Sequence, residues 1–195
     1  MRIILSTHNP SKAEQIKAMF SDPRFSVFTL DEVGVRGGAI EDGQTLTENA
    51  LKKALYAHQR GAWSMADDTG LFIHALVGQP GVHSARWAGP LATTQEIMRH
   101  TLRQLEGVKD RSATFETIVA LISPRGKKHF FRGKVEGKLL EAPRLPPRHK
   151  MPYNSIFVPN GQNLVLGEMS LELENSISHR GQAFRAARKF FEGFL

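Results

Sequence analysis

The sequence contains no cysteine, which excludes disulfide bonds and zinc sites built on thiolates. It also has no apolar run of about 18 residues, the length expected of a transmembrane helix. From its first residues the chain enters an apolar, strand-like stretch, without the basic and then apolar segments of a signal peptide. We therefore expect a cytoplasmic protein with no membrane partner.

Length and composition are typical of one folded domain or of two small lobes sharing a core. Of the 195 residues, 41% are hydrophobic and 23% are charged, which provides enough apolar surface for a core. The formal net charge of +7 suits a polyanionic partner, either a free nucleotide or a nucleic acid. It equally suits a basic surface that only keeps the protein soluble, so charge alone leaves these interpretations open.

The first third of the chain alternates predicted strands and helices. Residues 2–7 are rich in β-branched side chains and predict a buried strand, and Asn9-Pro10 then supplies an N-cap and a proline at the first helical position. Thr45 and Glu48 match a capping box that opens a helix extending to about Arg60. The residues of this helix expected to face inward are Ala50, Leu51, Ala54 and Leu55.

A second buried strand is predicted at Trp63–Ala66, delivering Asp67 and Asp68 at its end. A third helix is expected over Thr93–Leu105.

A long hairpin is predicted in the second half, from Ala113–Ile122 through the turn Ser123–Gly126 to His129–Leu139. The proline-rich and basic segment Ala142–Lys150 predicts a loop. A last helix from about His179 carries an apolar stripe, Ala183, Phe184, Ala187, Phe191 and Phe194, that is typical of core or interface packing. Together these elements predict an α/β fold with a mixed sheet and flanking helices.

The turn Thr7–Lys12 leads from the first strand into a helix N-terminus, where free N–H groups and the helix dipole favour an anion. Thr7, Asn9 and Ser11 offer hydrogen bonds, and Lys12 adds a positive charge where a helix itself prefers acidic residues. These features are compatible with a phosphate site. They also fit an ordinary turn with a surface lysine.

Acidic residues gather at a second candidate site. Glu41 and Asp42 precede the second helix, and Asp67 and Asp68 follow an apolar run. Adjacent carboxylates are costly to bury unless a cation pairs with them, and Mg²⁺ held together with substrate phosphates would do so. An exposed turn is the alternative, and Lys53 either reaches this place or is solvated.

Ser178-His179-Arg180-Gly181, at the start of the last helix, forms a third candidate site. Ser178 is a plausible N-cap, and arginine binds phosphate or carbonyl edges in a fork that lysine does not reproduce. Alone, this tetrapeptide is weak evidence.

The candidate segments recur in a specific order together with further motifs: Thr7–Lys12, Glu41–Ala54 (EDGQTLTENALKKA), Ala66–Leu71 (ADDTGL), Gly81–Gly89 (GVHSARWAG), Ile156–Pro159 and Ser178–Ala183 (SHRGQA). This series resembles the T-x-N-x-x-K, E-x-G-x-T-F-x-E-N-A-x-x-K-A, A-D-D-S-G-L, G-x-x-S-A-R-Y-A-G and S-H-R motifs of the inosine triphosphate pyrophosphatase-like family. Enzymes of that family hydrolyse ITP, dITP and XTP to the monophosphate and pyrophosphate. The resemblance spans nearly the whole chain.

The resemblance implies a single domain over residues 1–195, with an elongated mixed sheet and two lobes around a nucleotide cleft, usually as a homodimer. It implies that Glu41 and Asp68 bind Mg²⁺, assisted by Asp67, and that Asp68 is the general base. Thr69 keeps the hydroxyl of the family's serine, and His179 and Arg180 address the purine. The substrate-binding positions that it implies are Thr7, His8, Asn9, Pro10, Ser11, Lys12, Lys53, Thr69, Met151, Pro152, Tyr153, Asn154, Glu174, His179 and Arg180.

Two departures from the family pattern affect the base-reading side. Met151-Pro152-Tyr153-Asn154 stands where the family has F-G-Y-D, and a proline-rich, basic run replaces the glycine-rich run before it. Asn154 offers a donor and an acceptor where aspartate only accepts. Glu174 stands where the family has a substrate-facing lysine.

The sequence therefore predicts a Mg²⁺-dependent nucleoside triphosphate pyrophosphohydrolase with an altered or relaxed base preference, and no nucleic acid partner is expected. One alternative is a catalytically weak homologue that binds nucleotide or RNA through its basic surface. Another is a hydrolase whose substrate is a different modified nucleotide.

Overall fold

The computed structural model describes residues 1–59 and 61–194. Its centre is one seven-stranded mixed sheet with strand order β2-β1-β3-β5-β6-β7, and β4 pairs separately with β3. The strands are β1 Arg2–Leu5, β2 Ser26–Thr29, β3 Trp63–Ile73, β4 Pro80–Gly81, β5 Ser112–Ile122, β6 Lys128–Leu139 and β7 Phe157–Pro159. The α-helices are α1 Pro10–Met19, α2 Leu46–Tyr56, α3 Thr94–Gln104, α4 Leu171–Ile177 and α5 His179–Glu192. The predicted α/β class and the long hairpin are confirmed.

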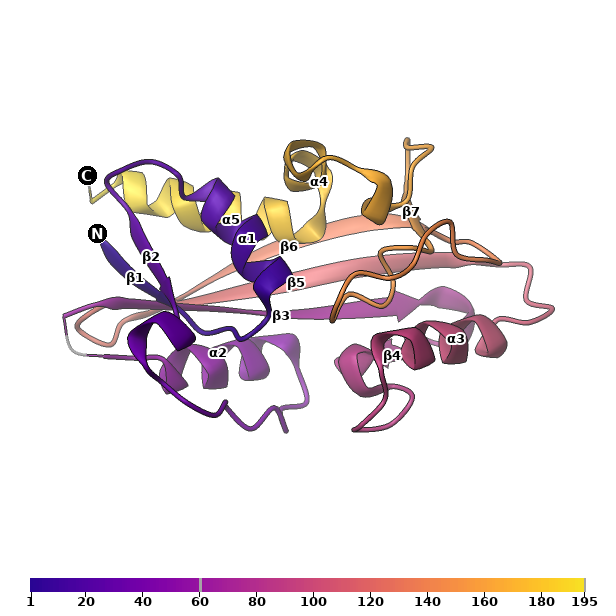
Figure 1. Cartoon of the computed structure of the whole chain (residues 1–195), viewed down its shortest axis with the longest axis horizontal. Coiled ribbons are helices and arrows are strands. Elements are labelled where there is room, and N and C mark those ends of the chain that lie inside the picture. The colour runs from indigo at the N-terminus through magenta and orange to yellow at the C-terminus, as the bar shows by residue number, and fades with distance from the viewer. Residues whose placement is uncertain (60, 195) are drawn as a thin grey trace.

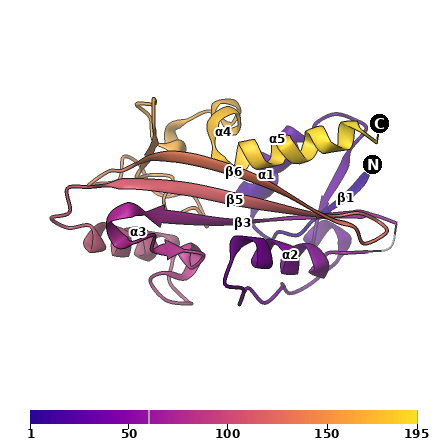
Figure 2. The same cartoon turned by 180° about the vertical axis from the view of Figure 1, so that it is seen from behind.

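The long strands β3, β5 and β6 run the length of the molecule, with helices on both faces (Figures 1 and 2). Helices α1, α4 and α5 lie on one face, whereas α2 and α3 cover different halves of the other (Figure 1). On the first face Phe184 and Phe191 of α5 pack with Ile16 of α1 and Val119 of β5. This packing holds α1 and α5 against the same part of the sheet, so their N-terminal ends meet near β3.

An interruption of the sheet positions the functional residues. Strand β1 pairs with β3 only as far as Met65, and β4 pairs only with Leu71 and Phe72. On this edge of β3, within the described part of the chain, the residues between them, Asp67 among them, pair with no strand. Because successive strand residues point to opposite faces, Asp67 and Asp68 are exposed to groups on opposite faces of the sheet.

Several predicted boundaries need correction. Strand β3 does not end at Ala66: it continues to Ile73, so Asp67 and Asp68 lie within the strand. Helix α2 ends at Tyr56, earlier than expected, and the predicted end at Arg60 lies outside the described residues. Its capping box is incomplete: Thr45 accepts from Glu48 N, but the Glu48 carboxylate accepts from Gln44 N and does not reach Thr45 N.

Two side chains of the predicted apolar stripes are exposed, Leu55, which was predicted to face inward, and Phe194, which was predicted to pack in the core or at an interface. Leu55 is 47% exposed, since the apolar stripe of α2 is carried by Leu46, Ala50 and Ala54. Phe194 is 56% exposed beyond the end of α5, where its ring meets the edge of Trp63. Within residues 1–59 and 61–194, none of the helices is both long and apolar enough to cross a membrane.

Candidate active site

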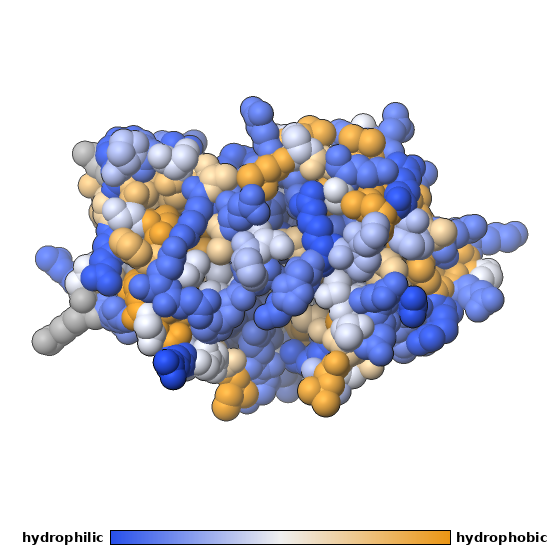
Figure 3. All heavy atoms as spheres, in the orientation of Figure 1, coloured by the Kyte–Doolittle hydropathy of each residue, from blue (hydrophilic) through white to orange (hydrophobic). Residues whose placement is uncertain are grey.

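A cavity of about 450 Å³ opens where the sheet is interrupted. Its walls come from the β1–α1 turn, the loop before α2, strand β3 and the start of α3, so residues far apart in the sequence meet there. Hydrophilic side chains dominate the centre of this face (Figure 3). Of the sequence-predicted site residues, the lining includes Thr7, His8, Asn9, Lys12, Glu41, Lys53, Asp67, Asp68, Thr69 and Pro152.

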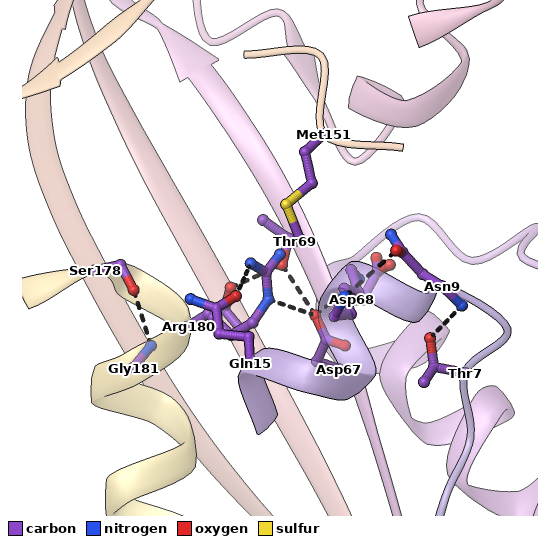
Figure 4. Close-up of polar contacts among 12 residues, drawn as sticks. Thr7, Asn9, Gln15, Asp67, Asp68, Thr69, Met151, Ser178, Arg180 and Gly181 are labelled. Carbon is purple, nitrogen blue, oxygen red and sulfur yellow. Dashed lines mark hydrogen bonds and ion pairs between the residues drawn. The ribbon is translucent and has the colours of Figure 1, made fainter. Parts of the chain in front are cut away.

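The β1–α1 turn is held by its own side chains. Asn9 is the N-cap of α1, as predicted, and its Oδ1 accepts hydrogen bonds from Ser11 N (3.1 Å) and Lys12 N (3.3 Å). Thr7 Oγ1 accepts from Asn9 N at 3.1 Å (Figure 4). Pro10 and Ser11 shape the helix start but lie outside the cavity lining. The cation that enters the cavity from this turn is therefore Lys12.

Asp67 is the anionic centre of the first face of β3. Its Oδ2 accepts from Lys12 Nζ at 2.9 Å and from Thr69 Oγ1 at 3.2 Å, and Arg180 Nε lies 3.6 Å away (Figure 4). Burial alone would raise the pKa of Asp67, but the charges of Lys12, Arg180 and Lys53 outweigh it and hold this pKa well below its usual range. Asp67 is consequently a permanent carboxylate that orients two cations.

Asp68 points to the other face and meets α2. Lys53 Nζ donates to Asp68 Oδ1 at 2.6 Å and to Glu41 Oε2 at 3.0 Å, so one ammonium joins the two carboxylates. The second oxygen, Asp68 Oδ2, is buried and has no hydrogen-bond partner within the described structure. Burial raises the pKa of Asp68, and the Lys53 charge offsets only part of that effect.

Glu41 and Asp68 are the candidate ligands for a divalent cation. No group of three or more His, Asp or Glu side chains with the spacing of a metal site occurs among the residues described. Glu41 and Asp68 nevertheless both contact one cation, Lys53 Nζ, and Asp68 Oδ2 is an unshared oxygen donor of the kind that Mg²⁺ prefers. Mg²⁺ often takes only one or two protein carboxylates and completes its shell with water and phosphate. The residues present fit such an ion.

A smaller cavity of about 80 Å³ adjoins the first. Here the ring of His179 stacks on Phe115, with centroids 4.4 Å apart and planes 10° from parallel. Burial, reinforced by the neighbouring Arg180 charge, lowers the pKa of His179 well below its ordinary value, so the ring is neutral. His179 Nδ1 is buried without a partner in the described structure. The predicted residues in this lining are Lys12, Thr69, Met151, Pro152, Tyr153, Asn154, His179 and Arg180.

The basic run and the segment after it, residues 142–154, are called the altered loop. Two of its residues have structural roles. Tyr153 Oη donates to Ser84 O at 2.8 Å inside the core, and burial raises the pKa of this phenol. Met151 directs its side chain toward Thr69 and Arg180 (Figure 4), and its sulfur accepts from Asn154 Nδ2 at 3.4 Å. The loop thus supplies one wall of the smaller cavity.

Glu174 does not line either cavity. It is buried, and its Oε2 accepts from Arg148 Nη1 at 2.8 Å. The anion that replaces the family's lysine is therefore neutralised by a cation from the altered loop.

Sequence reasoning missed several lining residues. Phe115 lies in β5, a strand that is buried along almost its whole length, so nothing in the sequence distinguishes it from an ordinary core residue. Ser84 lies in the motif Gly81–Gly89, for which no site role was predicted. Thr94 and Ile97 lie in the first turns of α3, and nothing in their local sequence indicates that they face the site. Lys150, which lines both cavities, lies in the basic run that the sequence predicts as a loop and as part of a basic surface, with no signal for a place in the site.

Comparisons with known proteins identify the family of the chain. A Ham1 family model matches residues 3–190. A dITP/XTP pyrophosphatase of Caldanaerobacter subterraneus subsp. tengcongensis is 40% identical over 194 residues, covering 97% of this chain and 96% of the relative. One from Thermoanaerobacter sp. (strain X514) is 37% identical with the same coverage.

Solved structures show the same architecture. A HAM1 protein from Coxiella burnetii superimposes with a TM-score of 0.85 at 32% identity, over 99% of both chains. The Staphylococcus aureus Ham1 protein gives 0.84 at 28% identity over 100% of both. These similarities confirm the resemblance drawn from the sequence motifs and the ITPase-like fold.

Proposed function

The chain belongs to the Ham1 family and is a hydrolase of nucleoside triphosphates, and from this we propose that it converts non-standard purine triphosphates such as ITP, dITP and XTP to the monophosphate and pyrophosphate with Mg²⁺. The observation that carries the proposal is the buried, unpartnered Asp68 Oδ2 in a cavity that also contains Lys12 and Lys53. The relatives' names support this house-cleaning role. The predicted homodimer, cytoplasmic location and single two-lobed domain stay predictions.

The charges of the larger cavity suit a polyphosphate. Lys12 and Lys53 have low exposure and are held in place by Asp67 and Asp68, respectively. In this proposal both ammonium groups neutralise phosphate oxygens, while Asp68 orients the water that attacks the α-phosphorus and takes its proton on the carboxylate oxygen that does not hold the ion. The α–β anhydride bond breaks and pyrophosphate leaves with the bond electrons. Positioning and charge neutralisation supply most of the rate enhancement in such reactions.

Glu41 and Asp68 are the residues proposed to hold Mg²⁺. When bound, the ion would neutralise phosphate charge and polarise the bonds to phosphorus. Asp67 supports the site indirectly, because its oxygen is already shared by Lys12 and Thr69.

The smaller cavity suits a planar base. The neutral His179 and the phenyl ring of Phe115 form an apolar wall, and Asn154 offers both hydrogen-bond polarities. An amide at this position supports the proposal of a relaxed or altered base preference.

The decisive experiment is an assay of the purified protein with Mg²⁺ against ITP, XTP, dITP and the four common ribonucleoside triphosphates, with pyrophosphate as the measured product. Pyrophosphate release from the hypoxanthine or xanthine nucleotides is the expected outcome. Release from one other modified nucleotide would instead favour the alternative substrate. Equal inactivity on all nucleotides would contradict the proposal, and tight nucleotide or RNA binding without turnover would favour the binding homologue.

A further inference from the structure

Lys150 takes a backbone conformation that lysine seldom adopts. Its φ is +56°, in the left-handed region. It occupies the third position of a turn that Met151 N closes by donating to Arg148 O at 2.9 Å, and glycine is the usual residue at such a position. A residue kept in a disfavoured backbone conformation beside a cavity is a candidate for a functional role.

The turn is anchored from two sides. Arg148 Nη1 donates to the buried Glu174 of α4 at 2.8 Å, and Arg148 Nη2 donates to Gly167 O at 3.1 Å. Lys150 N donates to Thr94 Oγ1, at the start of α3, at 3.1 Å. The backbone of Lys150 is therefore held in place, and its strained φ is imposed by contacts on either side.

Lys150 lies at the junction of the two cavities. Five residues line both of them: Lys12, Thr69, Ala85, Lys150 and Pro152. Two of these are cations, but they differ in their partners. Lys12 is paired with Asp67, whereas Lys150 is exposed and has no carboxylate within ion-pair distance among the residues described.

From this placement, and resting on the proposed function, we propose that Lys150 is a substrate-binding residue whose ammonium contacts the α-phosphate of the nucleotide. With the base in the smaller cavity and the terminal phosphates beside Lys12 and Lys53, the ribose and the α-phosphate span the junction. Of these two groups only the phosphate is an anion. The α-phosphate stays in the monophosphate product, so Lys150 binds this product as well as the substrate, but it does not bind pyrophosphate.

Product inhibition separates this contact from a contact with the terminal phosphates. The variants are Lys150→Met, Lys150→Arg and Lys150→Gly, with Lys128→Met as the matched control, since Lys128 is an exposed lysine outside both linings. For Lys150→Met we expect kcat/KM for ITP to fall roughly tenfold to a hundredfold, the range for a hydrogen bond to a charged group. The inhibition constant of inosine monophosphate should rise by a similar factor, and that of pyrophosphate should stay unchanged.

The glycine and arginine variants separate charge from folding. Lys150→Gly removes the backbone conflict, so its Tm should rise, yet it should lose as much kcat/KM as the methionine variant. Lys150→Arg should recover part of the activity. Wild-type kcat/KM and monophosphate inhibition in both the methionine and glycine variants would overturn the assignment, as would a loss confined to pyrophosphate inhibition or an equal loss in Lys128→Met.

The assignment can fail separately from the proposed function. If the wild-type protein hydrolyses none of the nucleotides, the proposed reaction is wrong, and calorimetric binding of inosine monophosphate to wild-type and Lys150→Met then tests the contact. Weaker binding to the variant supports Lys150 as a phosphate-contacting residue. Equal affinity, or no binding to either protein, rejects it.

Discussion

The guanidinium of Arg148 lies 2.8 Å from the carboxylate of Glu174, and this ion pair joins the altered loop to α4. The Glu174 side chain is only 2% exposed, whereas Arg148 reaches solvent. Removing the arginine would leave a buried charge without a partner, which costs more than losing the pair as a whole. The loop that bears Lys150 therefore depends on a charge that the family pattern does not contain.

Double replacement tests this pair. Arg148→Met should lower the free energy of unfolding by about 3 kcal/mol, because Glu174 is left uncompensated. Arg148→Met combined with Glu174→Leu should recover most of that loss. Urea denaturation of the two single variants and the double variant measures the coupling. Additive losses would show that the two side chains do not interact.

Asp68→Asn should reduce kcat by at least about a hundredfold, because the amide nitrogen or oxygen left at Oδ2 accepts a proton poorly and binds a cation weakly. Asp42→Asn is the matched control: Asp42 is an exposed carboxylate paired with Lys52 and lies outside both cavities. Steady-state kinetics and a thermal melt of both variants make the comparison. Near-wild-type turnover by a folded Asp68→Asn protein would contradict the assigned role.

Gly133 allows β6 and the start of α5 to approach closely. A Cβ at this position would overlap His179 O and lie 2.7 Å from Ala183 N, both in the backbone of α5. Gly133→Ala should therefore cost about 1–3 kcal/mol of stability and shift His179 within its cavity. The control is Gly193→Ala, where the nearest atom to the new Cβ is Phe190 O at 3.6 Å. Equal melting temperatures for the two variants would show that the backbone relaxes without cost.

The elements of the fold were predictable because their signals are local. Asn9-Pro10 begins α1, Ser178 caps α5, and the hairpin of β5 and β6 follows its turn residues. The extent of β3 was not predictable, since Asp67 and Asp68 are poor strand residues by themselves. They are accommodated because an interrupted sheet edge lets cations from α1, α2 and α5 reach them.

The residues of the candidate site also fall into two groups, those with a local sequence signal and those without one. Motif residues such as Lys12 and Asp68 were identified from sequence because their spacing is specific, whereas Phe115 and Lys150 enter the site only through long-range packing. Glu174 illustrates the opposite error. Its alignment with a substrate-facing lysine suggested a cleft position, but the partner that determines its environment, Arg148, lies 26 residues away in a loop of unusual sequence.

His179 should make stability depend on pH. Its folded pKa lies well below the ordinary value of about 6.5 because the ring is buried beside Arg180. Below pH ~6.5 the unfolded chain binds a proton that the folded protein does not, so stability is complete above that pH and is lost as the pH falls toward the folded pKa. The slope approaches about 1.4 kcal/mol per pH unit for one proton.

Comparing the wild type with His179→Gln isolates this effect, because His129, whose pKa burial also lowers, titrates in both proteins. Urea denaturation at pH 7 and pH 5 should show a larger loss for the wild type. Equal losses of stability in the two proteins would mean that His179 binds its proton as readily in the folded protein as in the unfolded chain.

The base preference should respond to Asn154. Its backbone is held by bonds to Met151 O and from Gly167 N, so a change of side chain leaves the loop in place. The amide can donate to the N1 acceptor of adenine and can equally accept from the N1–H of hypoxanthine or xanthine, whereas a carboxylate accepts only. Asn154→Asp should consequently raise the ratio of kcat/KM for ITP over ATP by about tenfold or more. Asn154→Leu, which removes both polarities at similar volume, should lower both rates with little change in the ratio. A ratio that stays the same in Asn154→Asp would mean that this side chain does not read the N1 edge of the base.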